Sequence, residues 1–193
     1  MKKFLFMGIA LCCSLSGFAQ EVVNCLIKTS IGDISIELYA KEAPLTVANF
    51  LAYVDADLYD NSSFYRVCNP TNEAKRDVKI EVIQGGNVSR DKSFEAIPLE
   101  RTSTTGLTHE DGMLSMARTA DINSATSHFF ICVNSQPALD FGGKRNPDGQ
   151  GFAAFGKVIS GMELVKEIQN KESRQQRLLE PVVIYSIERI AAR

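Results

Sequence analysis

The sequence has almost no excess of charge of either sign. Its 193 residues include 21 Lys and Arg against 23 Asp and Glu, which gives a formal net charge of −2. Nucleic-acid binding depends on a dense basic surface that neutralises phosphates, and this chain has no basic stripe. We therefore expect no nucleic-acid partner.

Motifs for bound phosphates, metals and redox thiols are also missing. The chain has neither G-x-x-x-x-G-K-[ST] nor G-x-G-x-x-G, which excludes the common nucleotide-binding loops. It has two histidines, no C-x-x-C, and no His/Cys group with the spacing of metal ligands. We expect no metal and no cofactor, and the missing C-x-x-C disfavours a thiol oxidoreductase.

The beginning of the chain has the pattern of an export signal. Two lysines follow Met1, an apolar run covers residues 4–15, and Gly17 and Ala19 place small residues just before Gln20. A positive start, a short apolar core and small residues at −3 and −1 are the features of a cleaved signal peptide. The pattern predicts cleavage before Gln20.

Two other interpretations of this segment are weaker. The apolar run is short for a membrane anchor, which must cross about 30 Å. A lipoprotein signal needs a small residue before the modified cysteine, whereas Leu11 precedes Cys12. We therefore predict a signal peptide over residues 1–19, one domain over residues 20–193, and a mature protein that is periplasmic or secreted.

Three cysteines remain after the predicted cleavage: Cys25, Cys68 and Cys132. An odd number means that at least one thiol is free or pairs with another chain. Cys25 and Cys132 lie within apolar, strand-like runs, where a buried structural cysteine is the favoured interpretation. One disulfide is possible, and the sequence does not select its pair.

Hydrophobic periodicity predicts many strands and two helices. The helices begin at Pro44, where proline fits a first turn, and after Gly161. An apolar stripe along the first helix favours packing against a sheet over a ligand-binding role. Strands without βαβ alternation indicate an antiparallel barrel or sandwich. The predicted strands cover residues 22–28, 33–39, 62–68, 78–84, 113–117, 129–133, 151–156 and 182–190.

A loop of small polar residues lies between the strands predicted at 113–117 and 129–133. Loops between rigid strands are common positions for binding chemistry. Arg66 near the end of one strand and Phe130 in another suggest a fixed charge beside an apolar wall. That pairing suits a neutral, partly hydrophobic substrate. The chain shows no nucleophile–base pair, which argues against acid–base hydrolysis. The paired glycines 85 and 86 indicate a bulge or a turn with a close backbone approach.

Five segments, in this order, carry a family resemblance: FYRV, IQGGN, GMLSMAR, NSATSHFFI and FAAFGKVISGMELV. Together they resemble the cyclophilin-type peptidyl-prolyl cis-trans isomerases, most closely the exported bacterial type, over nearly all of residues 22–190. The resemblance implies a mainly β fold, a closed eight-stranded antiparallel barrel capped by two α-helices. It also implies a monomeric isomerase that acts on X–Pro bonds of unfolded or partly folded exported proteins without a cofactor or metal.

The resemblance also assigns roles to individual residues. Arg66 matches the catalytic arginine, and Gln84 matches the glutamine that orients substrate and arginine. From the residues alone, Arg66 could be an ion-paired surface residue and the pocket positions could be plain core. The remaining matches are substrate-binding positions: Tyr65, Val82, Ala117, Thr119, Phe130, Leu139 and Phe152.

The chain departs from the family pattern at several of these positions. Glu81 stands where the family has an apolar ring, and Ala138 stands where it has an aromatic residue at the pocket rim. Tyr65 replaces a histidine, and His128 replaces a glutamine in what we expect to be a hydrogen-bonding role. These departures leave a second function class open, a cyclophilin-scaffold peptide-binding or chaperone module with weak or no catalysis.

Overall fold

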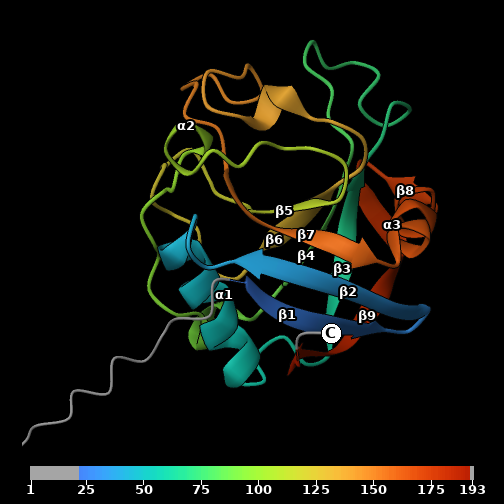
Figure 1. Cartoon of the computed structure of the whole chain (residues 1–193). Coiled ribbons are helices and arrows are strands. Elements are labelled where there is room, and N and C mark those ends of the chain that lie inside the picture. Colours follow the sequence, from blue (N-terminus) through green and yellow to red (C-terminus); the bar gives the residue numbers. More distant parts are fainter. Residues whose placement is uncertain (1–21, 192–193) are drawn as a thin grey trace, which may run out of the picture.

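The computed structural model describes residues 22–191, so the predicted signal segment lies outside the described range. Figure 1 shows these residues as one closed sheet with helices around it. The strands are β1 (Val22–Thr29), β2 (Gly32–Tyr39), β3 (Ser62–Cys68), β4 (Val82–Gly85), β5 (Met113–Met116), β6 (Phe129–Cys132), β7 (Ala153–Ser160), β8 (Ser173–Arg174) and β9 (Arg177–Ile190). The helices are α1 (Pro44–Asp55), α2 (Thr102–Thr105), α3 (Met162–Gln169) and the 3-10 turns η1 (Arg90–Lys92) and η2 (Pro137–Leu139).

The sheet closes on itself as an antiparallel barrel. The strand order is β1-β2-β7-β5-β6-β4-β3-β9, and β1 pairs again with β9. Closure pairs the backbone groups that would otherwise be exposed at two sheet edges. The two-residue strand β8 lies outside this ring and forms a hairpin with β9. The predicted eight-stranded antiparallel barrel is confirmed.

The barrel interior is filled by alternate side chains of its strands. On β2, Ile34, Ile36 and Leu38 are fully buried while their neighbours are more exposed, which is the period of two expected for a half-buried strand. Phe50 of α1 enters the same core and contacts the ring of Phe129, with centroids 5.4 Å apart in an edge-on arrangement. The apolar stripe of the first helix is therefore core.

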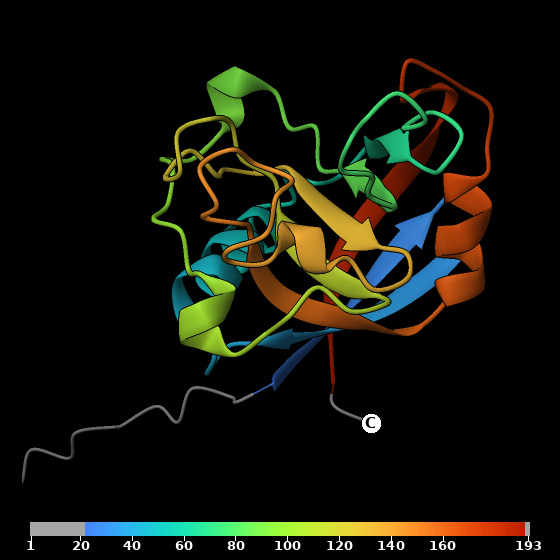
Figure 2. The same ribbon diagram turned by 90° about the horizontal axis from the view of Figure 1, so that it is seen from above.

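Two helices lie on opposite sides of the barrel, as Figures 1 and 2 show. Helix α1 packs against β2, β7 and β9, and α3 packs against β2, β3 and β4. Pro44 occupies the first turn of α1, and Gly161, at φ +92°, precedes α3. The prediction of two capping helices is confirmed, and the four-residue α2 is an addition to it. No helix within residues 22–191 is long and apolar enough to cross a membrane.

The predicted strand at 78–84 is wrong in its first half, since β4 begins at Val82. The carbonyl of Val78 accepts a hydrogen bond from Arg145 Nη1 at 2.7 Å rather than from a neighbouring strand. The backbone N–H of Glu81 likewise donates to the side chain of Gln136. Side chains thus take the place of strand partners at the Val78 carbonyl and the Glu81 N–H, whereas the Glu81 carbonyl accepts from the backbone N–H of Val133 at 2.9 Å.

Other strand boundaries differ by a few residues. Strand β7 begins at Ala153 and continues to Ser160, beyond the predicted range of 151–156. Strand β9 begins at Arg177, five positions before the predicted start, because its hairpin with β8 extends it.

The glycine pair after β4 makes the close approach that the sequence indicates. Gly86 has φ +77°, and a Cβ at this position would lie 2.5 Å from the backbone oxygen of Ser127. A side chain would be strained there by both the backbone conformation and the contact. The three cysteines of the described range are all buried and free, so none of them forms the disulfide that the sequence left open.

Candidate active site

A second apolar cluster covers part of the barrel's outer surface. It forms because strand neighbours point to opposite faces: Phe129 and Ile83 point into the barrel core, whereas Phe130 and Val82 belong to the outer cluster. An apolar surface outside a closed barrel has no strand or helix to pack against completely. It is therefore available to line a cavity.

Strand register places the key polar residues beside this cluster. Arg66 on β3 lies directly opposite Gln84 on β4, and Gln84 lies opposite Phe130 on β6. Directly opposed residues on neighbouring strands share a face of the sheet. A fixed cation, an amide and an aromatic ring thus form one row across three strands.

A cavity of about 270 Å³ opens at this row. Its apolar floor includes Phe130, which is 5% exposed, and Leu139, which η2 carries into place and which is 1% exposed. Phe152 meets the ring of Phe130 edge-on at 5.5 Å. The cavity is lined by Arg66, Arg76, Ile80, Val82, Gln84, Ala117, Arg118, Phe130, Leu139, Arg145, Asn146 and Phe152.

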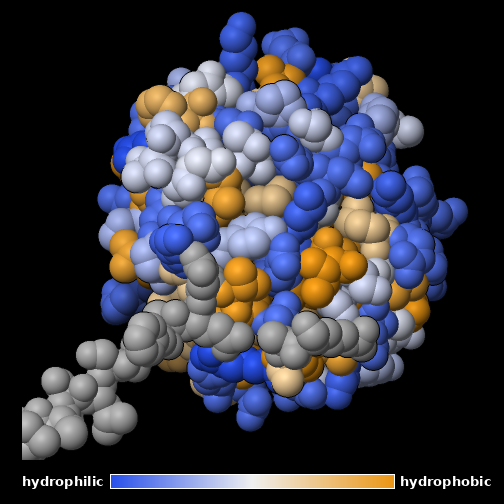
Figure 3. Space-filling model, viewed as in Figure 1, coloured by the Kyte–Doolittle hydropathy of each residue, from blue (hydrophilic) through white to orange (hydrophobic). Residues whose placement is uncertain are grey.

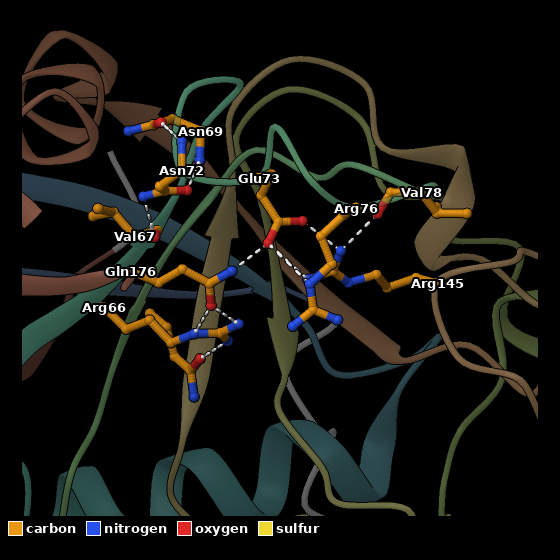
Figure 4. A network of polar contacts seen from close by, with 10 residues as sticks. Arg66, Val67, Asn69, Asn72, Glu73, Arg76, Val78, Arg145 and Gln176 are labelled. Atoms are coloured by element: carbon orange, nitrogen blue, oxygen red, sulfur yellow. Dashed lines mark hydrogen bonds and ion pairs between the residues drawn. The ribbon is translucent and has the colours of Figure 1, made fainter. Parts of the chain in front are cut away.

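Two neutral amides fix the guanidinium of Arg66, as Figure 4 shows in part. Its Nη1 donates to Gln84 Oε1 at 2.7 Å, and its Nε and Nη2 both donate to Gln176 Oε1, at 3.0 and 2.7 Å. Arginine has five N–H donors. Among the described residues, the other two donors, one on each Nη, have no acceptor.

Arg66 differs from its arginine neighbours in having no carboxylate partner. Arg118 pairs with Asp148 at 2.9 Å, and Arg145 forms a two-nitrogen ion pair with Glu73. No described carboxylate lies within ion-pair distance of Arg66, whose partners are both uncharged amides. The positive charge at the cavity is therefore fixed in position without being neutralised.

Behind Gln84, a short hydrogen-bonded chain determines how the amide is turned. Gln84 Nε2 donates to the hydroxyl of Tyr65 at 2.8 Å, and that hydroxyl lies 3.1 Å from Nδ1 of His128. Burial raises the pKa of Tyr65 and lowers the pKa of His128. Tyr65 therefore keeps its proton beside a neutral ring. Because its hydroxyl accepts from Gln84 Nε2, Gln84 Oε1 is directed at Arg66.

Comparison with known proteins decides the family. The chain matches the family described as cyclophilin type peptidyl-prolyl cis-trans isomerase/CLD over residues 25–189. The chain belongs to the cyclophilin-type peptidyl-prolyl cis-trans isomerases. The resemblance in its sequence motifs is thereby confirmed, and the protein is an enzyme of the isomerase class.

Individual cyclophilin relatives match along most of their length. The chain is 32% identical to peptidyl-prolyl cis-trans isomerase A of Dickeya dadantii (strain 3937), covering 96% of this chain and 97% of that one. It is 36% identical to peptidyl-prolyl cis-trans isomerase cyp18 of Streptomyces antibioticus, covering 83% and 94%.

Solved cyclophilin structures share the fold. A crystal structure of a cyclophilin-type isomerase from Cryptosporidium parvum superposes with a TM-score of 0.72 at 25% identity, covering 89% of this chain and 99% of the other. A second structure of that protein, determined in the presence of the dipeptide Ala-Pro, superposes with a TM-score of 0.70.

The structure gathers most of the predicted cyclophilin site around one cavity. Seven of the nine predicted residues line it: Arg66, Val82, Gln84, Ala117, Phe130, Leu139 and Phe152. Tyr65 lies one layer behind the cavity. Thr119 is not in the lining. Its N–H donates to Ser124 Oγ at 2.9 Å and its carbonyl accepts from Arg118 Nη1 at 3.1 Å, so both backbone groups are already bonded. The roles of these residues in substrate binding stay predictions.

Glu81, which stands where the family has an apolar ring, brings no charge to the cavity lining. Glu81 precedes Val82 and points away from the cavity, into a hollow that it shares with Asn69, Pro70 and Gln169 among others. The alternation of side chains along an extended segment accounts for this placement. Ala138 is also absent from the lining, so nothing replaces the aromatic rim at this position.

The sequence analysis missed several residues of the cavity and its support, among them Ile80, Gln176 and Glu73. Ile80 is buried in the outer cluster and supplies apolar surface next to Val82. The alternation of Val78, Ile80 and Val82 could have indicated it. Gln176 and Glu73, which support Arg66 from two loops, carry no sequence signal that distinguishes them from other polar residues.

Within residues 22–191, no group of three or more His, Cys, Asp or Glu side chains is arranged to hold a metal. The arrangement offers one oriented cation beside a cavity with an apolar floor. Such a site binds a neutral apolar group and polarises a polar one next to it.

Proposed function

We propose that this isomerase accelerates rotation about X–Pro peptide bonds in unfolded or partly folded exported proteins, with Arg66 as its catalytic group. Rotation about a peptide bond must overcome a barrier of about 18–20 kcal/mol, because the nitrogen lone pair is delocalised into the carbonyl. Uncatalysed X–Pro isomerisation accordingly takes roughly 10–100 s. A catalyst must favour the twisted state over both planar ones.

The chemistry of the twisted amide matches what Arg66 offers. Twisting localises the lone pair on the proline nitrogen and makes that nitrogen a better hydrogen-bond acceptor. A guanidinium with two unused donors and no counter-ion binds this state better than either planar state. Because its two amide partners are uncharged, the full charge is available to the substrate.

The cavity beside Arg66 supplies the selection for proline. Phe130, Leu139 and Val82 offer an apolar floor on which a proline ring can lie. A ring placed there brings its nitrogen next to the guanidinium, and no proton transfer or covalent step is required. The observation that carries the proposal is this row of Arg66, Gln84 and Phe130 across three strands.

A peptide-binding or chaperone module on the same scaffold is the second candidate. The missing aromatic rim at Ala138 favours it, because a shallower site binds peptides less firmly. The oriented and unneutralised Arg66 favours catalysis, since a binding module has no need of a group that recognises only the twisted state. An assay of turnover separates the two.

The test is a protease-coupled assay on a short X-Pro-Phe peptide, with the mature protein and two arginine variants. We expect the wild type to accelerate cis-to-trans conversion and Arg66→Ala to lower kcat/KM at least about tenfold, which corresponds to about 1.4 kcal/mol of transition-state stabilisation. Arg189→Ala is the matched control, because Arg189 pairs with Asp55 away from the cavity lining. It should keep wild-type activity.

Two results would change the proposal. If the reaction with the wild-type protein is no faster than the uncatalysed reaction, the peptide-binding or chaperone module replaces catalysis as the proposed function. Full activity in Arg66→Ala would show that the mechanism is wrong even if the isomerase activity is real.

We also propose that the protein is exported and acts on exported clients. The support is the pattern of residues 1–19, with small residues at Gly17 and Ala19 before the expected cleavage. Mass spectrometry of the protein from its native cells should give a chain that begins at Gln20, with this glutamine free or cyclised. A mature pool that retains Met1 in the cytoplasm would contradict export.

A further inference from the structure

We propose that Glu73 is a positioning residue for the isomerase reaction, which acts on the catalytic Arg66 through the side-chain amide of Gln176. Glu73 belongs to the polar insert between β3 and β4, and Gln176 belongs to the turn between β8 and β9. Figure 4 shows Gln176 between Glu73 and Arg66, with dashed lines that join it to both. The proposal rests on Arg66 having the role given above.

Glu73 is an unusual carboxylate because it is completely buried. A buried charge is costly unless it is paired and hydrogen-bonded. Arg145 donates both of its terminal nitrogens to it, and Arg145 is itself only 10% exposed. Gln176 Nε2 donates to the same carboxylate, and the exposed Arg76 lies 3.8 Å away. Glu73 is therefore fully satisfied and rigidly placed.

The direction of the Gln176 amide follows from the chemistry of its two neighbours. Arg66 can only donate hydrogen bonds, and an ionised Glu73 can only accept them. The amide meets both requirements in a single orientation, with Nε2 on Glu73 and Oε1 on Arg66. Without an acceptor at Glu73, the amide could turn and place its own N–H groups against the guanidinium. Glu73 thus determines which atom Arg66 meets.

The backbone of Gln176 leaves the side chain little freedom to find another arrangement. Gln175 and Gln176 both have positive φ, at 50° and 72°, in the tight turn between β8 and β9. The carbonyl of Gln176 accepts a hydrogen bond from the N–H of Val67 at 2.8 Å. This bond connects the turn directly to the residue that follows Arg66.

The intervening amide has a further consequence for the charge of the site. A carboxylate in direct contact with Arg66 would neutralise the guanidinium and weaken its attraction for a twisted amide. A neutral glutamine between the two transmits orientation while it keeps the opposite charges apart. Arg145, in contact with Glu73, takes the role of counter-ion instead.

The test uses three single variants and a background variant in the same isomerase assay. Gln176→Leu removes the amide but keeps the Glu73–Arg145 pair. Glu73→Gln replaces a carboxylate, which can only accept, by an amide that can also donate and therefore no longer dictates the orientation of Gln176. We expect each to lower kcat about tenfold with KM nearly unchanged, because the loss concerns the orientation of a group that acts in the transition state. In an Arg66→Ala background neither substitution should lower kcat further.

Asn72→Ala is the matched control within the same insert. The Asn72 side chain bonds to the N–H of Asn69, the carbonyl of Val67 and the hydroxyl of Ser173, and within residues 22–191 it has no hydrogen bond to Gln176. It should leave kcat within about twofold of the wild type. A loss in this control equal to that in Glu73→Gln would reduce Glu73 to a structural role and overturn the proposal.

A direct readout of orientation is the nuclear magnetic resonance signal of the Arg66 Nε–H group, which donates to Gln176. We expect this signal to shift and to exchange faster with water in Gln176→Leu and in Glu73→Gln. An unchanged signal with unchanged kcat in Glu73→Gln would overturn the proposal, as would equal losses with and without Arg66. If Glu73→Gln does not fold, the kcat and the Arg66 Nε–H signal of Gln176→Leu decide the proposal alone.

The same experiments separate this proposal from the one on which it rests. If the wild type has no isomerase activity, the proposed function fails. The Arg66 Nε–H signal then still shows whether Glu73 orients Arg66. If the wild type is active and the variants are not impaired, only the positioning role fails.

Discussion

Neutral hydrogen-bond partners are the main device of this site at the scale of single residues. Arg66 donates hydrogen bonds to Gln84 on one side and to Gln176 on the other. The orientation of each amide is fixed by a further hydrogen bond, from Gln84 to Tyr65 and from Gln176 to Glu73. The acceptor behind Gln176 is charged and buried, whereas the chain behind Gln84 ends at a neutral histidine ring. The two sides should therefore respond differently to pH.

The first prediction at this scale concerns His128. Burial lowers its pKa below the ordinary value of 6.5 that the unfolded chain has. Between the two values the unfolded state binds more protons than the folded state, so the free energy of unfolding must fall as the pH falls. The stabilisation that this ring contributes is complete above 6.5 and is lost as the pH drops to the lowered, folded-state pKa and below.

Urea denaturation from about pH 7.5 to about pH 5 measures this effect. The wild type should lose stability across the lower part of the range, and His128→Gln should lose less, because its amide does not titrate. Catalytic activity should follow, since a protonated ring can no longer accept the Tyr65 hydroxyl proton. Parallel curves for the two proteins would contradict the prediction.

At the scale of elements, β6 separates stability from function through its two faces. Phe129 is fully buried and contacts Phe50, Tyr59 and Phe64 edge-on or nearly so. Phe130, the next residue, forms the floor of the cavity with Phe152. Removing the Phe129 ring would leave a cavity in the barrel core, and removing the Phe130 ring would remove the floor of the binding site.

We therefore predict opposite consequences for two adjacent substitutions. Phe129→Ala should lower the free energy of unfolding by about 3–5 kcal/mol, the usual cost of deleting a packed ring from a core. Phe130→Ala should cost less stability, because its ring borders an open cavity, but should lower kcat/KM at least about tenfold. Urea denaturation and the peptide assay, run on both proteins, check this. Equal losses of stability would contradict the two-face assignment.

Periodicity predicted the elements whose side chains alternate regularly. The bounds of β2, predicted from the alternation of Ile34, Ile36 and Leu38, agree with the structure to within one residue, and those of β3 agree without error. The failure at residues 78–81 has a physical cause: their backbone groups bond to the side chains of Arg145 and Gln136, which lie far along the chain. Local pattern contains no information about such partners.

The candidate site likewise has a part that the sequence predicts and a part that depends on contacts between distant segments. Arg66, Gln84 and Phe130 lie on regular strands within recognisable motifs, so their common face follows from pairing register. Glu73 and Gln176 lie in turns about a hundred residues apart, and they meet because the barrel brings the two turns together. Glutamate is usually a surface residue, so nothing in the residue type of Glu73 indicates before the fold is known that it is buried.

At the scale of the whole molecule, the exposed apolar side chains of residues 22–191 bear on the question of a second copy. The face in Figure 3 is largely hydrophilic, with apolar side chains in separate patches. The exposed large apolar residues come from scattered segments: Leu45, Phe94, Phe141, Ile159, Leu179 and Tyr185. The expectation of a monomer stays a prediction, which light scattering on the mature protein would test.

The last prediction concerns the three thiols and bears on the proposal that the protein is exported. Cys25, Cys68 and Cys132 are fully buried and free. Burial raises the pKa of all three, that of Cys25 to about 12, so almost no thiolate forms near neutral pH. Since the thiolate is the reactive species, the native fold should protect these cysteines in an oxidising compartment without any disulfide.

A thiol reagent measures this protection directly. The native mature protein should react at none of the three cysteines on the timescale in which a small free thiol reacts completely, and all three should react in denaturant. Because each thiol lies in the core or the outer cluster, their reaction should report opening of the whole barrel, and the rate should rise together in Phe129→Ala. Rapid labelling of one cysteine in the native protein would show that local opening reaches it, and would contradict a barrel that opens as one unit.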